Sequence, residues 1–221
     1  MATVNTAKLD LALPVPGTNE PMNNGAILSS NMDKIDKLPY EFCTSTTRPS
    51  TPSVGDIIYE TDKNRLRLWD GSQWAFIAGD PPRCMLRNQV GGSIPGATIT
   101  PIPFETEDLD TDGMHDPVTN NTRITTNEKG LYYFEAGSWT DQMGEFEPFF
   151  NIGGLARLRG MGGNTAWQFG PEVRIGHFIE CQVGTYVMFE LATSVGATYG
   201  PLGDSTAETY FNAYLVSSYT F

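Results

Sequence analysis

The sequence has few of the residues on which most catalytic and metal sites depend. It contains two histidines and three cysteines among 221 residues, and no two cysteines are close in the sequence. Cys43, Cys84 and Cys181 therefore fit neither a disulfide framework nor a zinc site, which need paired or short spacings. We expect all three to be buried, reduced thiols in a protein made in a cytoplasm.

Long apolar runs and basic residues are also scarce. No run approaches the roughly 20 residues of a membrane helix, and the first residues lack the basic and apolar parts of a signal peptide. Lys and Arg number 14 against 26 Asp and Glu, a net charge of −12. Such a surface repels phosphate backbones and anionic lipid, so we expect neither a nucleic-acid partner nor membrane insertion.

Turn formers and strand formers are plentiful instead. The chain has 23 glycines and 15 prolines spread along its length, and 11% aromatic residues. Beyond Asp80, short runs rich in Thr, Tyr, Phe and Val recur at about ten-residue spacing, which predicts an all-β sandwich or jelly roll. GLYYFEA (130–136) and GTYVMFEL (184–191) are apolar on both faces in part. We therefore infer that sister subunits cover one of these faces.

The chain divides into four regions. Residues 1–47 predict an anchoring arm with a short amphipathic helix over 25–38, ended by Pro39. Residues 48–79 predict a small three-stranded β-meander, in which Leu66, Leu68 and Trp74 supply one face. Residues 80–99 form a linker and a first strand, and 100–221 form the jelly roll.

The run FETEDLDTDGMHDPVTNNTRITTNEKGLYYF (104–134) carries a family likeness. It resembles the complement-head and tumour-necrosis-factor-like jelly rolls, in which an acidic turn leads to a short Ile-Thr strand and then to Gly-x-Tyr-x-Phe. The matching residues are Asp110, Gly113, Asp116, Ile124, Thr125, Gly130, Tyr132 and Phe134. The resemblance implies a ten-stranded jelly roll that forms a homotrimer around an aromatic axis. Its candidates for core or axis positions are Tyr132, Tyr186, Phe189 and Tyr214.

The first half of the chain is similar to other proteins. Residues 11–36 resemble the openings of bacteriophage tail-fibre and minor virion proteins, and GDIIYET…LWDGSQW (55–74) resembles the small module that follows in them. The likeness implies a short trimeric fibre or knob in the virion that contributes to host attachment by binding a host receptor or glycan. Residues 1–47 would then bind other virion proteins. A head fibre or capsid decoration protein has the same parts, and an extracellular signalling ligand is a further alternative.

Asp108, Asp110 and Asp112 copy the first half of a calcium loop, in which alternate carboxylates face one cation. The twelfth position is Thr119 rather than Glu, which excludes an EF-hand. We expect a solvated acidic loop and no cofactor, with calcium as the alternative.

No catalytic signature is visible. His177 and Cys181 lie on one face of a predicted strand, but roughly 13 Å apart. We expect no catalytic residues and no enzymatic activity. A glycan-acting enzyme stays the alternative, because any two of 26 acidic residues could meet in space. The segment 153–163 (GGLARLRGMGG) predicts a loop between strands.

Overall fold

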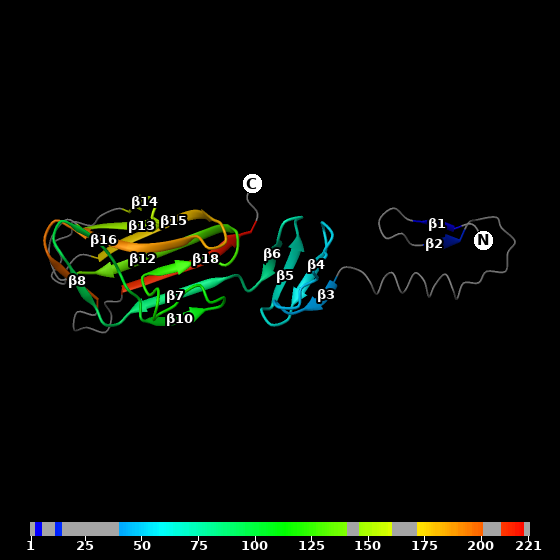
Figure 1. Ribbon diagram of the computed structural model, residues 1–221, viewed down its shortest axis with the longest axis horizontal. Coiled ribbons are helices and arrows are strands. Elements are labelled where there is room, and N and C mark those ends of the chain that lie inside the picture. Colours follow the sequence, from blue (N-terminus) through cyan, green and yellow to red (C-terminus); the bar gives the residue numbers. More distant parts are fainter. Residues whose placement is uncertain are drawn as a thin grey trace. The chain divides into compact units, whose positions relative to one another are not determined.

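The computed structural model describes residues 3–5, 12–14, 40–140, 146–160, 172–200 and 209–218, and none of these lies in a helix. The helix predicted over 25–38 lies outside the described residues. Within them, no helix is long and apolar enough to cross a membrane. The chain forms two compact units, residues 1–75 and 76–221 (Figure 1).

The first unit begins with two short paired strands. β1 (Thr3–Asn5) runs antiparallel to β2 (Ala12–Pro14). β2 ends at a proline, which has no backbone N–H to continue a ladder.

A second sheet of this unit has four strands in the order β3-β4-β5-β6. β3 (Tyr40–Cys43) is parallel to β4 (Ile57–Glu60), which is antiparallel to β5 (Arg65–Trp69). β6 (Trp74–Gly79) carries the chain into the second unit. The predicted meander of three strands is therefore incomplete, because residues assigned to the arm pair with β4 and add a fourth strand.

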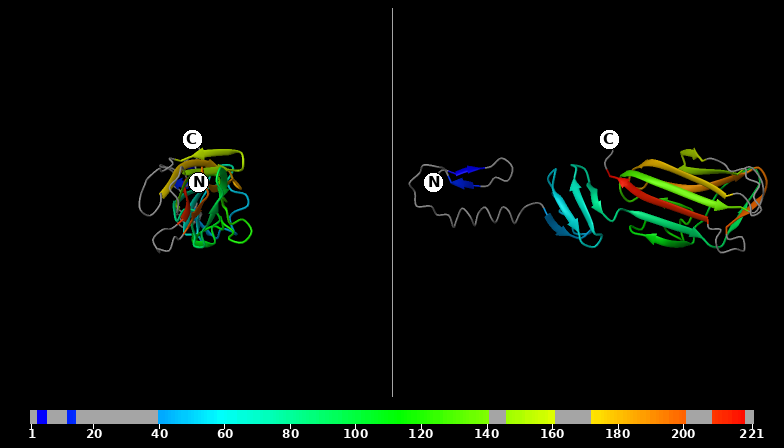
Figure 2. Two further views of the ribbon diagram at one scale, coloured as in Figure 1. Left: turned by 90° about the vertical axis from the view of Figure 1, so that its left-hand side faces the viewer. Right: turned by 180° about the vertical axis from the view of Figure 1, so that it is seen from behind.

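Two five-stranded sheets make up most of the second unit (Figure 2). The first has the order β10-β7-β18-β12-β15, and its strands are β7 (Arg83–Asn88), β10 (Thr106–Asp110), β12 (Gly130–Trp139), β15 (Glu172–Cys181) and β18 (Thr209–Ser217). The second has the order β11-β16-β13-β14, with β9 also paired to β16, and its strands are β9 (Thr98–Pro101), β11 (Arg123–Thr125), β13 (Phe146–Ile152), β14 (Ala156–Arg159) and β16 (Tyr186–Thr193). β8 (Gly92–Ile94) and β17 (Ala197–Tyr199) form a separate pair.

The order of the strands is that of a jelly roll. From β11 onward the chain crosses from the second sheet to the first at β12, back at β13, and again at β15, β16 and β18. All pairings of the two sheets are antiparallel, and the early β7 lies beside the last described strand, β18. Ten strands in two sheets confirm the predicted all-β jelly roll among the described residues. It begins at β7, before residue 100, because β7 is an interior strand of the first sheet.

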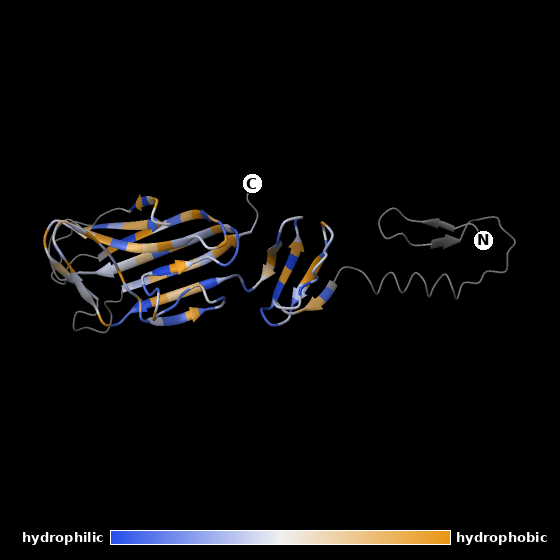
Figure 3. Cartoon of the chain, viewed as in Figure 1, coloured by the Kyte–Doolittle hydropathy of each residue, from blue (hydrophilic) through white to orange (hydrophobic). Residues whose placement is uncertain are grey.

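The core lies between the two sheets and is rich in phenylalanine. Phe134, Phe150, Phe189 and Phe211 are fully buried, and the rings of Phe150 and Phe211 stack with their centroids 5.7 Å apart. Buried and part-exposed residues alternate along β12, as expected for a strand with one face in the core. The same alternation is visible as bands of hydropathy along the strands (Figure 3). Each buried ring contributes roughly 1.5–3 kcal/mol through apolar surface removed from water.

Candidate functional site

The outward face of the first sheet carries a row of aromatic side chains. In the strand register, Tyr133 of β12 is paired with Phe178 of β15 on one side and with Tyr214 of β18 on the other. The rings of Tyr133 and Phe178 have centroids 5.0 Å apart. Phe178 is 63% exposed. Val216, two residues after Tyr214 on β18, is 51% exposed.

Two glycines let tyrosine rings lie flat against this sheet. A Cβ atom at Gly176 would stand 2.5 Å from the hydroxyl oxygen of Tyr133. A Cβ atom at Gly137 would likewise stand 2.6 Å from Cε1 of Tyr210. Both distances are shorter than atoms tolerate, so glycine is required for the rings to take these positions. We call the set Tyr133, Phe178, Tyr210, Tyr214 and Val216 the aromatic face.

Polar residues lie among these rings. The amide of Asn212 donates a hydrogen bond to Glu135, 3.1 Å from Nδ2 to Oε1. Arg83 is the register partner of Tyr214 on β7. Burial raises the pKa of Tyr214, and the nearby Glu135 carboxylate adds to the effect. Tyr214 is therefore a neutral hydrogen-bonding group at physiological pH.

The four predicted core or axis residues separate into three environments. Tyr132 and Phe189 are fully buried in the core of the single chain. Tyr186 lies on β16 in the second sheet, where the guanidinium of Arg123 stands 4.8 Å from its ring centroid. Only Tyr214 belongs to the aromatic face.

Sequence reasoning missed Tyr133, Phe178 and Tyr210. The signal was the phase of the alternation in GLYYFEA: Glu135 shares a face with Tyr133, whereas the apolar Phe134 and Ala136 share the other face with Tyr132. A charged residue at the same phase marks the outward set of side chains.

The predicted acidic loop was wrong for 108–110, because these residues belong to β10, which pairs with β7, and the turn begins only after Asp110. Asp108 is paired with Arg87 on the neighbouring strand. Asp110 accepts hydrogen bonds from the backbone N–H groups of Asp112 (3.1 Å) and His115 (2.9 Å). Among the described residues, no group of three His, Cys, Asp or Glu side chains is placed to hold a metal ion.

His115 is enclosed beside this acidic segment. Its Nε2 lies 3.2 Å from the backbone oxygen of Phe104, to which it can donate a hydrogen bond. Nδ1 is buried with no hydrogen-bond partner among the described residues and lies 4.0 Å from a carboxylate oxygen of Glu107. Burial lowers the pKa of His115, opposed by Asp110 and Asp116. Burial also raises the pKa of Glu107, which those two aspartates raise further.

The cysteines are placed as inert thiols. Cys43, Cys84 and Cys181 are free and buried. Burial raises the pKa of Cys181 to about 12 and raises that of Cys84 as well. His177, on the same strand as Cys181, instead has its ring 6.4 Å from that of Phe150. At neutral pH these thiols stay protonated, and protonated thiols are poor nucleophiles.

The predicted loop over 153–163 contains a strand, β14. Arg157 on this strand forms an ion pair with Glu190, which is 3% exposed, with 2.7 Å between Nε and Oε2. Asn151 donates a second hydrogen bond to the same carboxylate, 2.8 Å from Nδ2 to Oε1. The loop prediction was wrong for 156–159, because the register with β13 lets β14 complete this part of the sheet.

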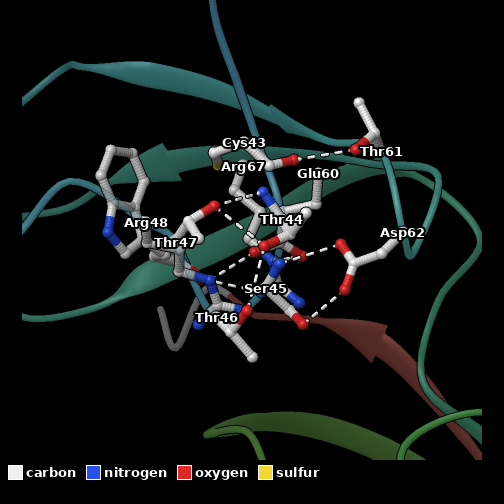
Figure 4. A network of polar contacts seen from close by, with 11 residues as sticks. Cys43, Thr44, Ser45, Thr46, Thr47, Arg48, Glu60, Thr61, Asp62 and Arg67 are labelled. Atoms are coloured by element: carbon white, nitrogen blue, oxygen red, sulfur yellow. Dashed lines mark hydrogen bonds and ion pairs between the residues drawn. The ribbon is translucent and has the colours of Figure 1, made fainter.

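Charged side chains are buried on one face of the small four-stranded sheet. Glu60 is fully buried, and its Oε2 accepts a hydrogen bond from Nε of Arg67 at 2.7 Å. Arg48 pairs with the other carboxylate oxygen, and Nη1 of Arg67 donates to the backbone oxygen of Trp74 at 2.9 Å. Arg67 is only 1% exposed. Figure 4 shows both arginines beside Glu60.

A turn packed with hydroxyl groups lies next to this ion cluster. Ser45 donates from its backbone N–H and from its hydroxyl to the two oxygens of Asp62, at 2.9 and 2.6 Å (Figure 4). The hydroxyl of Thr61 donates to the backbone oxygen of Cys43 at 3.1 Å. These bonds join the segment after β3 to the turn after β4. The hydrogen bonds from Ser45 also lower the pKa of Asp62.

The prediction that Leu66 and Leu68 share a core face with Trp74 was wrong. Leu66 is the register partner of Tyr59 and lies on the opposite face from Arg67, which packs inside with Trp74. Trp69 instead packs against Trp74, with ring centroids 5.5 Å apart.

Comparison with solved structures finds similarity to many chains, among them two jelly-roll proteins. The globular domain of zebrafish complement 1qA aligns with 62% of this chain and 98% of its own, at 13% identity and a TM-score of 0.45. Murine APRIL aligns with 62% of this chain and 100% of its own, at 8% identity and a TM-score of 0.48. No protein-family model and no curated protein matches the sequence.

Proposed function

We propose that the chain is a non-enzymatic structural protein that self-associates as a homotrimer through the aromatic face. The observation that supports this is the row Phe178–Tyr133–Tyr214 on the outside of the first sheet. Phe178 is exposed and the tyrosines beside it are partly exposed, and a contiguous aromatic surface of this kind is typical of one that another protein covers. The number of subunits follows from the resemblance of 104–134 to trimeric jelly rolls.

The proposed role is that of a short fibre or knob on a bacteriophage particle, with the jelly roll facing outward toward a host receptor or glycan. Residues 1–47 would bind other virion proteins. The support is the likeness of 11–36 and 55–74 to phage tail-fibre and minor virion proteins. A head fibre or capsid decoration protein is the alternative, and it differs only in where the arm attaches.

Light scattering on the full-length chain tests the homotrimer. We expect three times the mass of one chain for the wild type, and a smaller mass for the double variant Tyr133→Ser, Phe178→Asp. The control is Leu155→Asp, because Leu155 is 95% exposed in the turn between β13 and β14, away from the first sheet. A monomeric wild type, or equal loss of mass in the control, would refute the proposal.

Immunogold labelling of purified particles tests the location. Gold at the tail tip supports host attachment, and gold over the capsid supports the decoration role. Particles that lack the protein would rule out both.

A further inference from the structure

The small four-stranded sheet exposes an apolar face. Phe42 is the register partner of Tyr59, and Tyr59 of Leu66, so the three lie in one row across β3, β4 and β5. The rings of Phe42 and Tyr59 are in edge contact, with centroids 5.8 Å apart. Ile57 and Leu68 form the next pair on the same face. Phe42 is 70% exposed and the other four are partly exposed.

Most sheets bury apolar side chains on one face and leave charged side chains in water on the other, whereas this sheet does the opposite. Its other face encloses Glu60, Arg65 and Arg67, each 1% exposed or less. Among the described residues of this unit, the apolar cluster on that face consists of Cys43, Ile58 and Trp74, with Trp69 packed against them. Burying ions while leaving apolar side chains in water is unfavourable for an isolated module. So small a core also contributes little stability of its own.

We propose that this apolar face, formed by Phe42, Ile57, Tyr59, Leu66 and Leu68, packs against the same face of sister subunits. The contact is a second self-association surface of the homotrimer, in addition to the aromatic face. This inference rests on the proposed function, since it takes the trimer as given.

Charge favours a sister subunit as the occupant. None of the five positions carries a charge, so copies with a net charge of −12 each can approach here without placing like charges in contact. An ionic partner would find no group on this face to pair with. Each copy of the chain carries one such apolar face, so every face in the assembly has an apolar face of another copy to pack against.

Chain connectivity favours the same occupant. Only residues 80–82 separate β6 from β7, and β7 is a strand of the sheet that carries the aromatic face. Once three jelly rolls associate, their small sheets are held at a high local concentration, so even a modest apolar contact forms.

Cross-linking of the full-length chain tests the contact. Tyr59→Cys places one thiol at the centre of the face, whereas the native thiols are buried. With a short bis-maleimide reagent we expect covalent dimers on a denaturing gel, since each single thiol can join only one other. Val54→Cys is the control: Val54 is 75% exposed in the same unit but lies in the segment before β4.

A second pair of variants measures the energy of the contact. Phe42→Asp should raise the dissociation constant of the trimer at least tenfold relative to Val54→Asp. A wild type that is trimeric by light scattering, with no cross-link at position 59 and equal dissociation of the two Asp variants, overturns this inference alone. A monomeric wild type overturns the proposed function and this inference with it.

Discussion

The hydroxyl end of Tyr133 lies over the backbone of Gly176, on the neighbouring strand of the first sheet. The space available there is less than a single methyl group, because a Cβ atom at position 176 would stand 2.5 Å from the tyrosine oxygen. The atom that would have to move is the tip of a side chain at the surface. Any larger residue at position 176 therefore changes the aromatic face more than it changes the core.

Gly176→Val should weaken self-association while leaving each chain folded. Valine suits a strand position, so we expect the circular dichroism spectrum to be unchanged. The displaced Tyr133 ring should raise the trimer dissociation constant at least tenfold in sedimentation experiments. Gly196→Ala is the control, because its nearest neighbour would be 3.9 Å from the new Cβ atom. Unaltered association of the valine variant would show that Tyr133 is not part of an interface.

The turn built on Asp110 gives a test of the calcium alternative. Asp110→Ala removes the acceptor for two backbone N–H groups and should lower stability by about 1–2 kcal/mol. Since both oxygens of the Asp110 carboxylate already accept hydrogen bonds from the backbone, we expect Asp110→Ala to lower the melting temperature equally with excess calcium and with a chelator. Asp108→Asn, which breaks only the surface pair with Arg87, should cost less. A calcium-dependent rise in the wild-type melting temperature that disappears in Asp110→Ala would instead establish a calcium site.

His115 should make stability fall as the solution is acidified. Burial holds its pKa below the ordinary 6.5, so the unfolded chain takes up a proton more readily than the folded one. The stability that comes from keeping His115 neutral is fully present above pH 6.5, and it is lost as the pH falls toward the lowered pKa of the folded state. The slope cannot exceed about 1.4 kcal/mol per pH unit for one proton.

Denaturant unfolding at several pH values checks this effect. His115→Gln keeps an N–H group that can donate to the backbone oxygen of Phe104 but cannot titrate, so its stability should vary less between pH 7.5 and 5.5. Glu107 has the opposite effect, because its raised pKa removes stability as the pH rises above 4.5. Its contribution is common to wild type and variant, so the difference reports His115. Parallel curves for the two proteins would contradict the assignment.

The sequence predicts the class and layers of the fold better than it predicts the faces. Period-two alternation and turn residues in 80–221 are local signals, and they are sufficient to predict an all-β sandwich or jelly roll; the resemblance of 104–134 narrows this to a jelly roll. Which of two adjacent tyrosines, Tyr132 or Tyr133, points outward depends on the phase set by Phe134 and Glu135. A shift of one residue in that phase places the wrong ring on the outward face of the sheet.

The small sheet was harder to predict because its decisive contacts are non-local. The alternation in RLRLW suggests leucines inside and arginines outside, but the Glu60 carboxylate and the backbone oxygen of Trp74 hold Arg67 inward. Likewise β3 lacks a hairpin signal, because it pairs with β4 in parallel across a long connection. Neither the ion cluster nor the fourth strand has a signature within a short window of sequence.

The buried ion cluster of the small sheet gives the last prediction. Glu60→Gln keeps the shape of the side chain but leaves Arg67 without its buried counter-charge, which should cost about 3–5 kcal/mol. A loss of 3 kcal/mol corresponds to roughly hundredfold faster hydrogen exchange of residues 57–69 if exchange proceeds through unfolding of this sheet. Glu41→Gln, at an exposed position of β3, is the matched control. The double variant Glu60→Leu, Arg67→Met should recover much of the protection, because both members of the Glu60–Arg67 pair are removed together and Arg48 can reach solvent. If the double variant exchanges as fast as Glu60→Gln, then the cluster also determines the shape of the module, and charge pairing alone does not account for its presence.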